Sequence, residues 1–140
     1  MNYIFFNAEM VKQIKTGRKT EARRPVVAFK RCCYGKPGNV LLVLRRTPFS
    51  AFLRDKFPKM FRKFFWIWYE TKIEIVSLKQ KKLKQYIDFE KEGFETLALF
   101  SMEEKKEMFY EYWDKIYGDT YYQSRFNPTV WVIEFKVVGK

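Results

Sequence analysis

Apolar and polar residues alternate along parts of this chain, and the alternation predicts strands. From Thr129 to Val138 the large apolar side chains recur at every second position, which is the period of a strand with one buried face. The segment from Thr71 to Leu78 alternates in the same way. Tyr3 to Phe6 and Val40 to Leu44 are short apolar runs of β-prone residues, and we interpret them as two further strands.

Two other segments have the helical period. Asn7 is a predicted N-cap, and Met10, Val11 and Ile14 follow on one helical face before Gly17, where a left-handed terminator belongs.

The second helix begins with a capping box formed by Ser101 and Glu104. Its apolar residues follow at helical spacing before Gly118, and they are Phe109, Tyr112, Trp113 and Ile116.

Loops separate these elements. The stretch from Gly17 to Arg24 is predicted to be a tight loop rich in cations, after which Val26 to Phe29 is an extended candidate. Lys36 to Asn39 carries a turn signal.

The segment from Pro48 to Tyr69 interleaves aromatic and basic residues, and its pattern fits either a basic helix or a hairpin arm. We expect most of its rings to lie in the core and one or two exposed rings to offer platforms for nucleobases. The rings are Phe49, Phe52, Phe57, Phe61, Phe64, Phe65, Trp66, Trp68 and Tyr69.

Length and composition indicate one globular domain. The chain has 140 residues, of which 47% are hydrophobic and 20% aromatic, enough for one aromatic-rich core. No apolar run approaches the roughly 20 residues of a membrane span, and the N-terminus lacks a signal-peptide pattern. We therefore expect a cytoplasmic protein that does not enter membranes. Cys32 and Cys33 are expected to be reduced thiols, since two adjacent cysteines make neither a disulfide framework nor a metal site.

Charge narrows the choice of partners. The chain has no histidine, which removes the usual general base and every Ser-His or Cys-His nucleophile pairing. The net charge is +12, and the first 84 residues hold 21 basic and 5 acidic side chains. Such asymmetry is typical of proteins that bind polyanions, although a solubilising surface would give the same composition.

Several short motifs occur in an order that resembles phage-type ASCH domains. The first is Asn7 to Val11, followed by Gly17-Arg18-Lys19-Thr20 and Arg23-Arg24. Later come Lys36-Pro37-Gly38, Glu92-Gly93-Phe94 within the piece from Leu83, and the ending Asn127 to Phe135. The family signature of a glycine, a lysine two residues on and an arginine seven on is matched by Gly17, Lys19 and Arg24. The resemblance covers most of the chain except residues 45 to 70.

The resemblance implies an α+β fold, namely a PUA-like, mostly antiparallel β-barrel flanked by short α-helices. We expect residues 1–140 to form one such domain with an atypical aromatic-basic insertion around 45–70. It also implies a cleft beside the Gly-Lys loop that receives RNA, another single-stranded nucleic acid, or a modified nucleoside.

Some relatives in that family hydrolyse acetylated cytidine, and their pattern assigns Lys19 as base and Glu92 as acid. The position of their nucleophilic threonine holds Ala22, so only direct attack by activated water would remain. A second departure is Arg45-Arg46-Thr47-Pro48, where relatives commonly carry Arg-Glu-Thr-Trp. Both changes favour anion binding over acid–base chemistry.

These observations lead to one main hypothesis and two alternatives. The main hypothesis is a nucleic-acid-binding domain without metal or other cofactor, whose basic cleft is formed by Lys19, Arg23, Arg24, Arg45 and Arg46. One alternative is a hydrolase, either an amidohydrolase that uses Lys19 and Glu92 or a metal-dependent nuclease. The other is an interaction protein whose aromatic arm contacts another protein.

Overall fold

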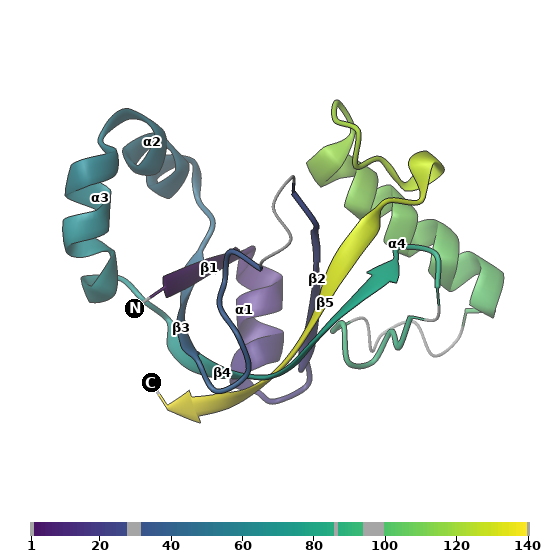
Figure 1. Cartoon of the computed structure of the whole chain (residues 1–140), viewed down its shortest axis with the longest axis horizontal. Helices are drawn as coiled ribbons and strands as arrows, with labels where there is room; N and C mark the ends of the chain where they lie inside the picture. The colour runs from purple at the N-terminus through teal and green to yellow at the C-terminus, as the bar shows by residue number, and fades with distance from the viewer. Residues whose placement is uncertain (1, 28–31, 86, 94–99, 140) are drawn as a thin grey trace.

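The computed structural model describes residues 2–27, 32–85, 87–93 and 100–139, and its centre is a five-stranded sheet (Figure 1). The strand order is β1-β3-β4-β5-β2. Only β1 and β3 run parallel, and the other three neighbouring pairs are antiparallel. The strands are β1 (Asn2–Phe6), β2 (Glu21–Pro25), β3 (Val40–Arg45), β4 (Thr71–Lys82) and β5 (Thr129–Gly139).

The sheet confirms the α+β class with mostly antiparallel strands, but it is not closed. β1 and β2 are its two edges, and within the described ranges no ladder joins them. The strongly bent β4 and β5 nevertheless bring the edges toward each other (Figure 1), helped by a register shift between Ile75 and Ser77. A side chain spans the remaining gap, since Arg24 Nη2 on β2 donates to the Phe5 carbonyl on β1 at 2.9 Å.

Both predicted helices form with the caps that the sequence indicated. In α1 (Ala8–Lys15) the Asn7 side chain accepts from the Met10 N–H, and Gly17 follows with φ +80°. In α4 (Met102–Tyr117) Ser101 and Glu104 form a complete capping box.

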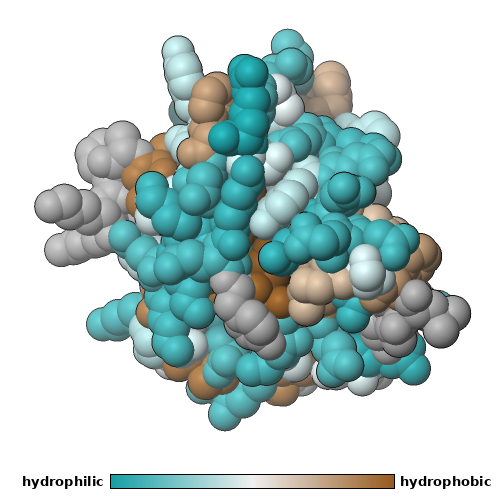
Figure 2. Space-filling model, turned by 90° about the vertical axis from the view of Figure 1, so that its right-hand side faces the viewer, coloured by the Kyte–Doolittle hydropathy of each residue, from teal (hydrophilic) through white to brown (hydrophobic). Residues whose placement is uncertain are grey.

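Three apolar clusters fix these elements to the sheet. The first lies under α1 and includes Ile14, Ile73 and Ile133, while the second joins α4 to β5 through Trp113 and Val132. Because Val132 and Ile133 contribute to different clusters, β5 is covered on both faces. The third cluster lies under the helices of residues 48–67. Figure 2 shows that the side of the molecule carrying α4 is mostly hydrophilic, with hydrophobic residues visible in a small central recess and at scattered places around the rim.

The segment left open between helix and hairpin arm is helical. It forms α2 (Pro48–Lys56), α3 (Pro58–Phe64) and the 3-10 turn η1 (Phe65–Ile67), at the opposite end of the sheet from α4 (Figure 1). The expectation that most of its rings are core was wrong. Phe61 and Phe65 are buried, but five rings are at least 47% exposed, because short helices on a sheet edge can bury only one face. These rings are Phe49, Phe52, Phe57, Trp66 and Trp68.

Two boundaries differ from expectation. The cation-rich loop is shorter than predicted, because β2 begins at Glu21 and places Arg23 and Arg24 in a strand. Val26 and Val27 follow β2, whereas the rest of the extended candidate through Phe29 lies outside the described residues, as does Phe94 of the Glu-Gly-Phe motif. Cys32 and Cys33 are free thiols. Among the helices described, none has the length and apolar character needed to span a bilayer.

Candidate nucleic-acid interface

The end of α1 and the start of β2 hold Lys19 in place through main-chain hydrogen bonds. The N–H groups of Arg18 and Lys19 both donate to the Gln13 carbonyl, which turns the chain back over the helix end. The N–H groups of Thr20 and Glu21 then donate to the Lys91 carbonyl at 2.9 and 3.0 Å. These bonds fix the loop against residues 88–93, which are far away in sequence.

Glu92 is the buried carboxylate that pairs with two buried cations. Its Oε1 accepts from Arg23 Nε at 3.0 Å, and its Oε2 lies 3.4 Å from Lys19 Nζ. Lys19 also donates to the Glu92 carbonyl at 2.7 Å. Gly93 allows this approach, because its φ of +93° suits glycine and a Cβ there would lie 3.3 Å from the Lys19 Cβ.

Burial shifts the protonation of this cluster. Burial lowers the pKa of Lys19 from its ordinary value, although the neighbouring Glu92 carboxylate opposes the shift. Burial also raises the pKa of Glu21 to about 7, with the negative charge of Glu92 adding to the effect. A buried lysine with a lowered pKa beside a carboxylate is a feature that active sites share with structural ion pairs.

Arg24 lies beside this cluster, and its guanidinium packs on the Phe6 ring and not against Glu92. Its guanidinium is 4.8 Å from the centre of the Phe6 ring and donates to two main-chain carbonyls, those of Arg23 and Phe5. The ring and the carbonyls together hold the guanidinium plane in one orientation.

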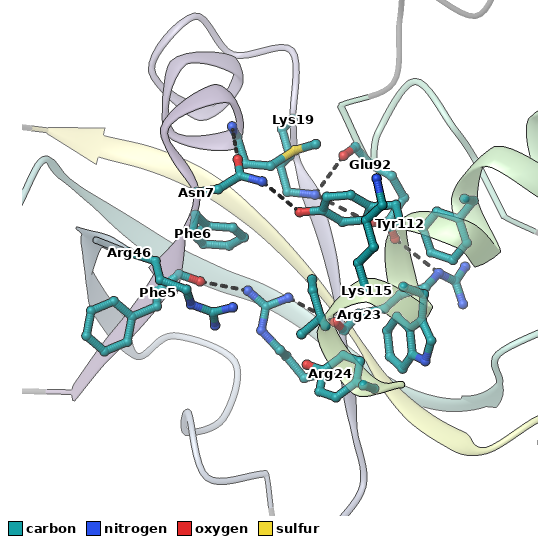
Figure 3. Close-up of a pocket in the computed structure, with 15 residues that line it drawn as sticks. Phe5, Phe6, Asn7, Lys19, Arg23, Arg24, Arg46, Glu92, Tyr112 and Lys115 are labelled. Atoms are coloured by element: carbon teal, nitrogen blue, oxygen red, sulfur yellow. Dashed lines mark hydrogen bonds and ion pairs between the residues drawn. The ribbon is translucent and has the colours of Figure 1, made fainter. Parts of the chain in front are cut away.

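A cavity of about 230 Å³ opens between β1, β2 and α4 (Figure 3). Lys19, Arg23, Arg24 and Glu92 all line it. Its other walls come from the start of α1 and from α4. Asn7 connects these two helices, because its side-chain amide donates to the Tyr112 hydroxyl at 2.9 Å while its oxygen caps α1.

The charge around the cavity is strongly positive. Among the described residues, five cationic side chains line it against one carboxylate, that of Glu92. Lys19 and Arg23 are buried against that carboxylate. Arg46 and Lys115 are exposed and Arg24 is partly exposed, so these three cations are accessible from solvent.

The structure does not bring every predicted residue to this cavity. Arg45 points elsewhere, lines a different hollow and pairs with Glu70 at 2.9 Å, because neighbouring positions at a strand end face opposite sides. Ala22 is 1% exposed and belongs to the core cluster under α1. The cavity lining among the described residues therefore does not include the position that carries a threonine in the amidohydrolases.

The sequence did not predict several residues that line the cavity, among them Lys115, Tyr112 and Asn7, which was predicted only as a helix cap. Tyr112 was identified only as part of the apolar helix pattern, and Lys115 was an ordinary surface lysine. The only available signal was that Tyr112 and Lys115 are three residues apart, a spacing that places both on one face of α4. Which face of the helix meets the cavity depends on packing that the sequence does not state.

Comparison with known proteins identifies the fold. No protein-family model matches the chain, and no curated protein matches it. Among solved structures, a crystal structure of an ASCH domain from Lactobacillus crispatus JV V101 matches with a TM-score of 0.59 and 16% identity, over 93% of this chain and 70% of that one. The chain has the fold of an ASCH domain.

A second structure supports the ASCH fold. A protein from Enterococcus faecalis V583, assigned to the family model DUF984, matches with a TM-score of 0.60 and 12% identity. The match covers 99% of this chain and 81% of that chain. Because both identities are low, the likeness concerns the fold, and the function must be argued from the residues of this chain.

Proposed function

We propose that this chain binds RNA or another single-stranded nucleic acid in the cavity between β1, β2 and α4. The observation that carries the proposal is the charge of the described cavity lining, with five cations against one carboxylate. Such a field attracts polyanions, since phosphate contacts release the counterions condensed on a nucleic acid. The motifs that resemble ASCH domains imply the same class of ligand.

The cations divide into two groups with different roles. Lys19 and Arg23 are buried against Glu92 and hold the cavity floor. Arg24, Arg46 and Lys115 contact the ligand phosphates. The planar guanidinium groups offer paired N–H donors to a phosphate, whereas Lys115 acts as a point charge.

The size and lining of the cavity favour an unpaired strand over a duplex. Its volume of about 230 Å³ is below the ~300–1,000 Å³ of sites for drug-sized ligands, so it fits about one nucleobase unit. The partly exposed ring of Tyr112 lines it and offers apolar surface to a base. A base can enter such a hollow only when it is free of its pairing partner.

The test is a titration of fluorescein-labelled eight-nucleotide RNA at several NaCl concentrations. With three phosphate contacts, the logarithm of the association constant should fall with the logarithm of the salt concentration at a slope of about −2 or steeper. The double variant Arg46→Gln/Lys115→Gln should weaken binding roughly 25-fold at 0.1 M salt and reduce the slope by about 1.4.

The matched control is Lys12→Gln/Lys79→Gln, which removes two exposed lysines that do not line the cavity. It should leave the slope within a few tenths of the wild-type value. A salt-independent affinity in the wild type, or equal losses in the two double variants, would contradict the proposal.

A second candidate function is hydrolysis of acetylated cytidine. Lys19 favours it, because a buried lysine with a lowered pKa in a cavity is a candidate general base. In this scheme neutral Lys19 takes a proton from water, the hydroxide adds to the acetyl carbonyl, and the amide C–N bond breaks to give acetate and cytidine. The proton that Lys19 has taken would pass through the Glu92 carboxylate to the leaving nitrogen, so that Glu92 keeps the role of acid.

Incubation with acetylated cytidine tests this activity by the release of cytidine. Lys19→Met should abolish release, whereas Arg46→Gln/Lys115→Gln should retain it. No release by the wild-type protein, or release that survives Lys19→Met, would dispose of the hydrolase. For the metal-dependent nuclease there is no matching observation, since the part of the chain that the structure describes contains no group of three His, Cys, Asp or Glu side chains placed to hold a metal ion.

A further inference from the structure

A second hollow, which the proposed function does not use, lies between β1 and the helices α2 and α3. It has a volume of about 300 Å³, and three arginines line it, namely Arg46, Arg54 and Arg62. Its described lining contains no carboxylate. Two tyrosines, Tyr3 and Tyr34, also line it and add aromatic rings and hydroxyl groups to its walls.

This arginine hollow adjoins the first cavity. Phe5 and Arg46 line both, so the two concavities meet at the edge of the sheet. Figure 3 shows Arg46 and Phe5 next to Arg24, on the side of the cavity away from Glu92. Positively charged side chains therefore lead from the cavity beside α4 to the helices α2 and α3 at the other end of the sheet.

Packing of α2 and α3 on β1 holds two of these arginines in place. Phe61 of α3 lies 5.3 Å from the Tyr3 ring and 5.9 Å from the Phe5 ring, measured between ring centres. Arg54 of α2 places its guanidinium 5.3 Å from the centre of the Phe5 ring. Its Nε also donates to the neighbouring Asp55 at 3.1 Å, but that pair is solvent-exposed and is worth little.

We infer that a single-stranded oligonucleotide held in the cavity continues across Arg46 into the arginine hollow, where Arg54 and Arg62 contact its next phosphates. The helices α2 and α3 are then an accessory arm that makes this protein a binder of strands several nucleotides long, and not of single nucleotides. Charge complementarity selects this occupant, because three arginines line the hollow while its described lining has no carboxylate, and such a row matches the regular charge of a phosphodiester chain. The inference rests on the proposed function and extends it.

The experiment compares labelled oligouridylates of two, four, six and eight nucleotides. Wild-type affinity should rise steeply between two and six nucleotides, as the strand reaches the arginine hollow. Arg54→Gln/Arg62→Gln should weaken binding of the eight-nucleotide strand roughly 25-fold at 0.1 M salt and reduce its salt slope by about 1.4. Binding of the dinucleotide should stay unchanged.

The matched control is Lys56→Gln/Lys59→Gln, which removes the same charge from the same pair of helices at exposed positions outside the hollow. It should reproduce the wild-type dependence on length. The single variant Arg62→Gln should fold normally, because Arg62 is exposed, and it serves as a check if the double variant misfolds. It should give about half of the reduction in salt slope.

The outcomes separate this inference from the proposed function. If strands of every length bind equally, or if Arg54→Gln/Arg62→Gln matches its control, the inference is wrong while the cavity proposal stands. If no strand binds at any length, both are wrong. Binding to anionic lipid vesicles that the arginine variant abolishes, without binding to oligonucleotides, would also overturn the inference.

Discussion

At the scale of single residues, Glu92 has the largest expected influence on stability. It is 3% exposed and its two oxygens contact two buried cations, Lys19 and Arg23. Glu92→Gln keeps the shape but removes the charge that compensates them, and removing one partner of a buried pair typically costs 3–5 kcal/mol. We expect the free energy of unfolding in urea at pH 7 to fall by roughly 3 kcal/mol.

Glu103→Gln is the control for this substitution. Glu103 pairs with Lys106 on the surface of α4, and its side chain is 84% exposed, so its loss should change stability by less than about 0.5 kcal/mol. Equal effects of the two substitutions would show that the buried cations do not depend on Glu92.

Glu21 should make stability depend on pH near neutrality. Its pKa is raised from 4.5 to about 7 in the folded protein, so between these values the folded state binds a proton that the unfolded state has released. Stability from this group is therefore highest below pH 4.5 and is lost as the pH rises through 7. Glu21→Gln should be more stable than wild type at pH 8, with a difference that shrinks toward pH 5.

Urea unfolding of both proteins at pH 5, 6, 7 and 8 measures that difference. Titrating groups remote from Glu21 contribute equally to both proteins and cancel. A difference that does not vary with pH would mean that Glu21 titrates normally in the folded state.

The sequence identified part of the cavity at this scale, and the reason is the spacing of its motifs. Lys19, Arg24 and Glu92 stood in motifs resembling one family, and the structure brings all three to one cavity. Lys115 stood in no motif, and Arg45 could not be separated from Arg46 without the register of β3. The direction of a side chain at a strand end depends on one residue of register, which the pattern does not fix.

At the scale of elements, Asn7 joins helix capping to the shape of the cavity. Asn7→Ala removes both the cap and the bond to Tyr112 and should cost about 1 kcal/mol. Asn7→Ser keeps a cap acceptor but is too short to reach the Tyr112 hydroxyl, so its stability should stay within a few tenths of a kcal/mol of wild type.

The Tyr112 phenol distinguishes these effects. The bond from Asn7 lowers the pKa of Tyr112, against the burial that raises it. Both substitutions should therefore raise this pKa further, as read by NMR of tyrosine-labelled protein, while only Asn7→Ala destabilises α1. A Tyr112 pKa unchanged in both variants would show that the bond does not form in solution.

Elements with local signals were predicted well, and elements whose form depends on tertiary contacts were not. Ser101 and Glu104 fixed the start of α4, and alternation fixed β5, because both signals lie within a few residues. The aromatic-basic segment had no single period, since α2 and α3 are two short helices separated by Phe57. Their form depends on packing Leu53, Phe61 and Phe65 against β1 and β3, which are distant in sequence.

At the scale of the whole molecule, two positively charged concavities lie at the edges of the sheet, outside its apolar core. Among the described residues, six cations of the first 84 residues line the cavity or the arginine hollow, both at the edges where the sheet stays open. An open edge leaves room for side chains such as Arg24 to face a ligand, whereas closure by hydrogen bonds would fill that space. Within the described residues no ladder joins β1 and β2, and this opening is where we propose that the nucleic acid binds.

The same concentration of charge should make the unliganded protein sensitive to salt. With a net charge of +12, repulsion between cations opposes the folded state, and screening relieves it. The screening length shrinks from about 30 Å at 0.01 M to about 10 Å at 0.1 M salt, while the exposed ion pairs contribute little that salt could weaken. We therefore expect the urea midpoint at pH 7 to rise between 0.01 and 0.1 M NaCl. At a pH close to the isoelectric point of about 9.7 the net charge vanishes, and the rise should vanish with it. A midpoint that falls with salt at pH 7 would mean that attractive pairs, and not repulsion, dominate the electrostatics of the fold.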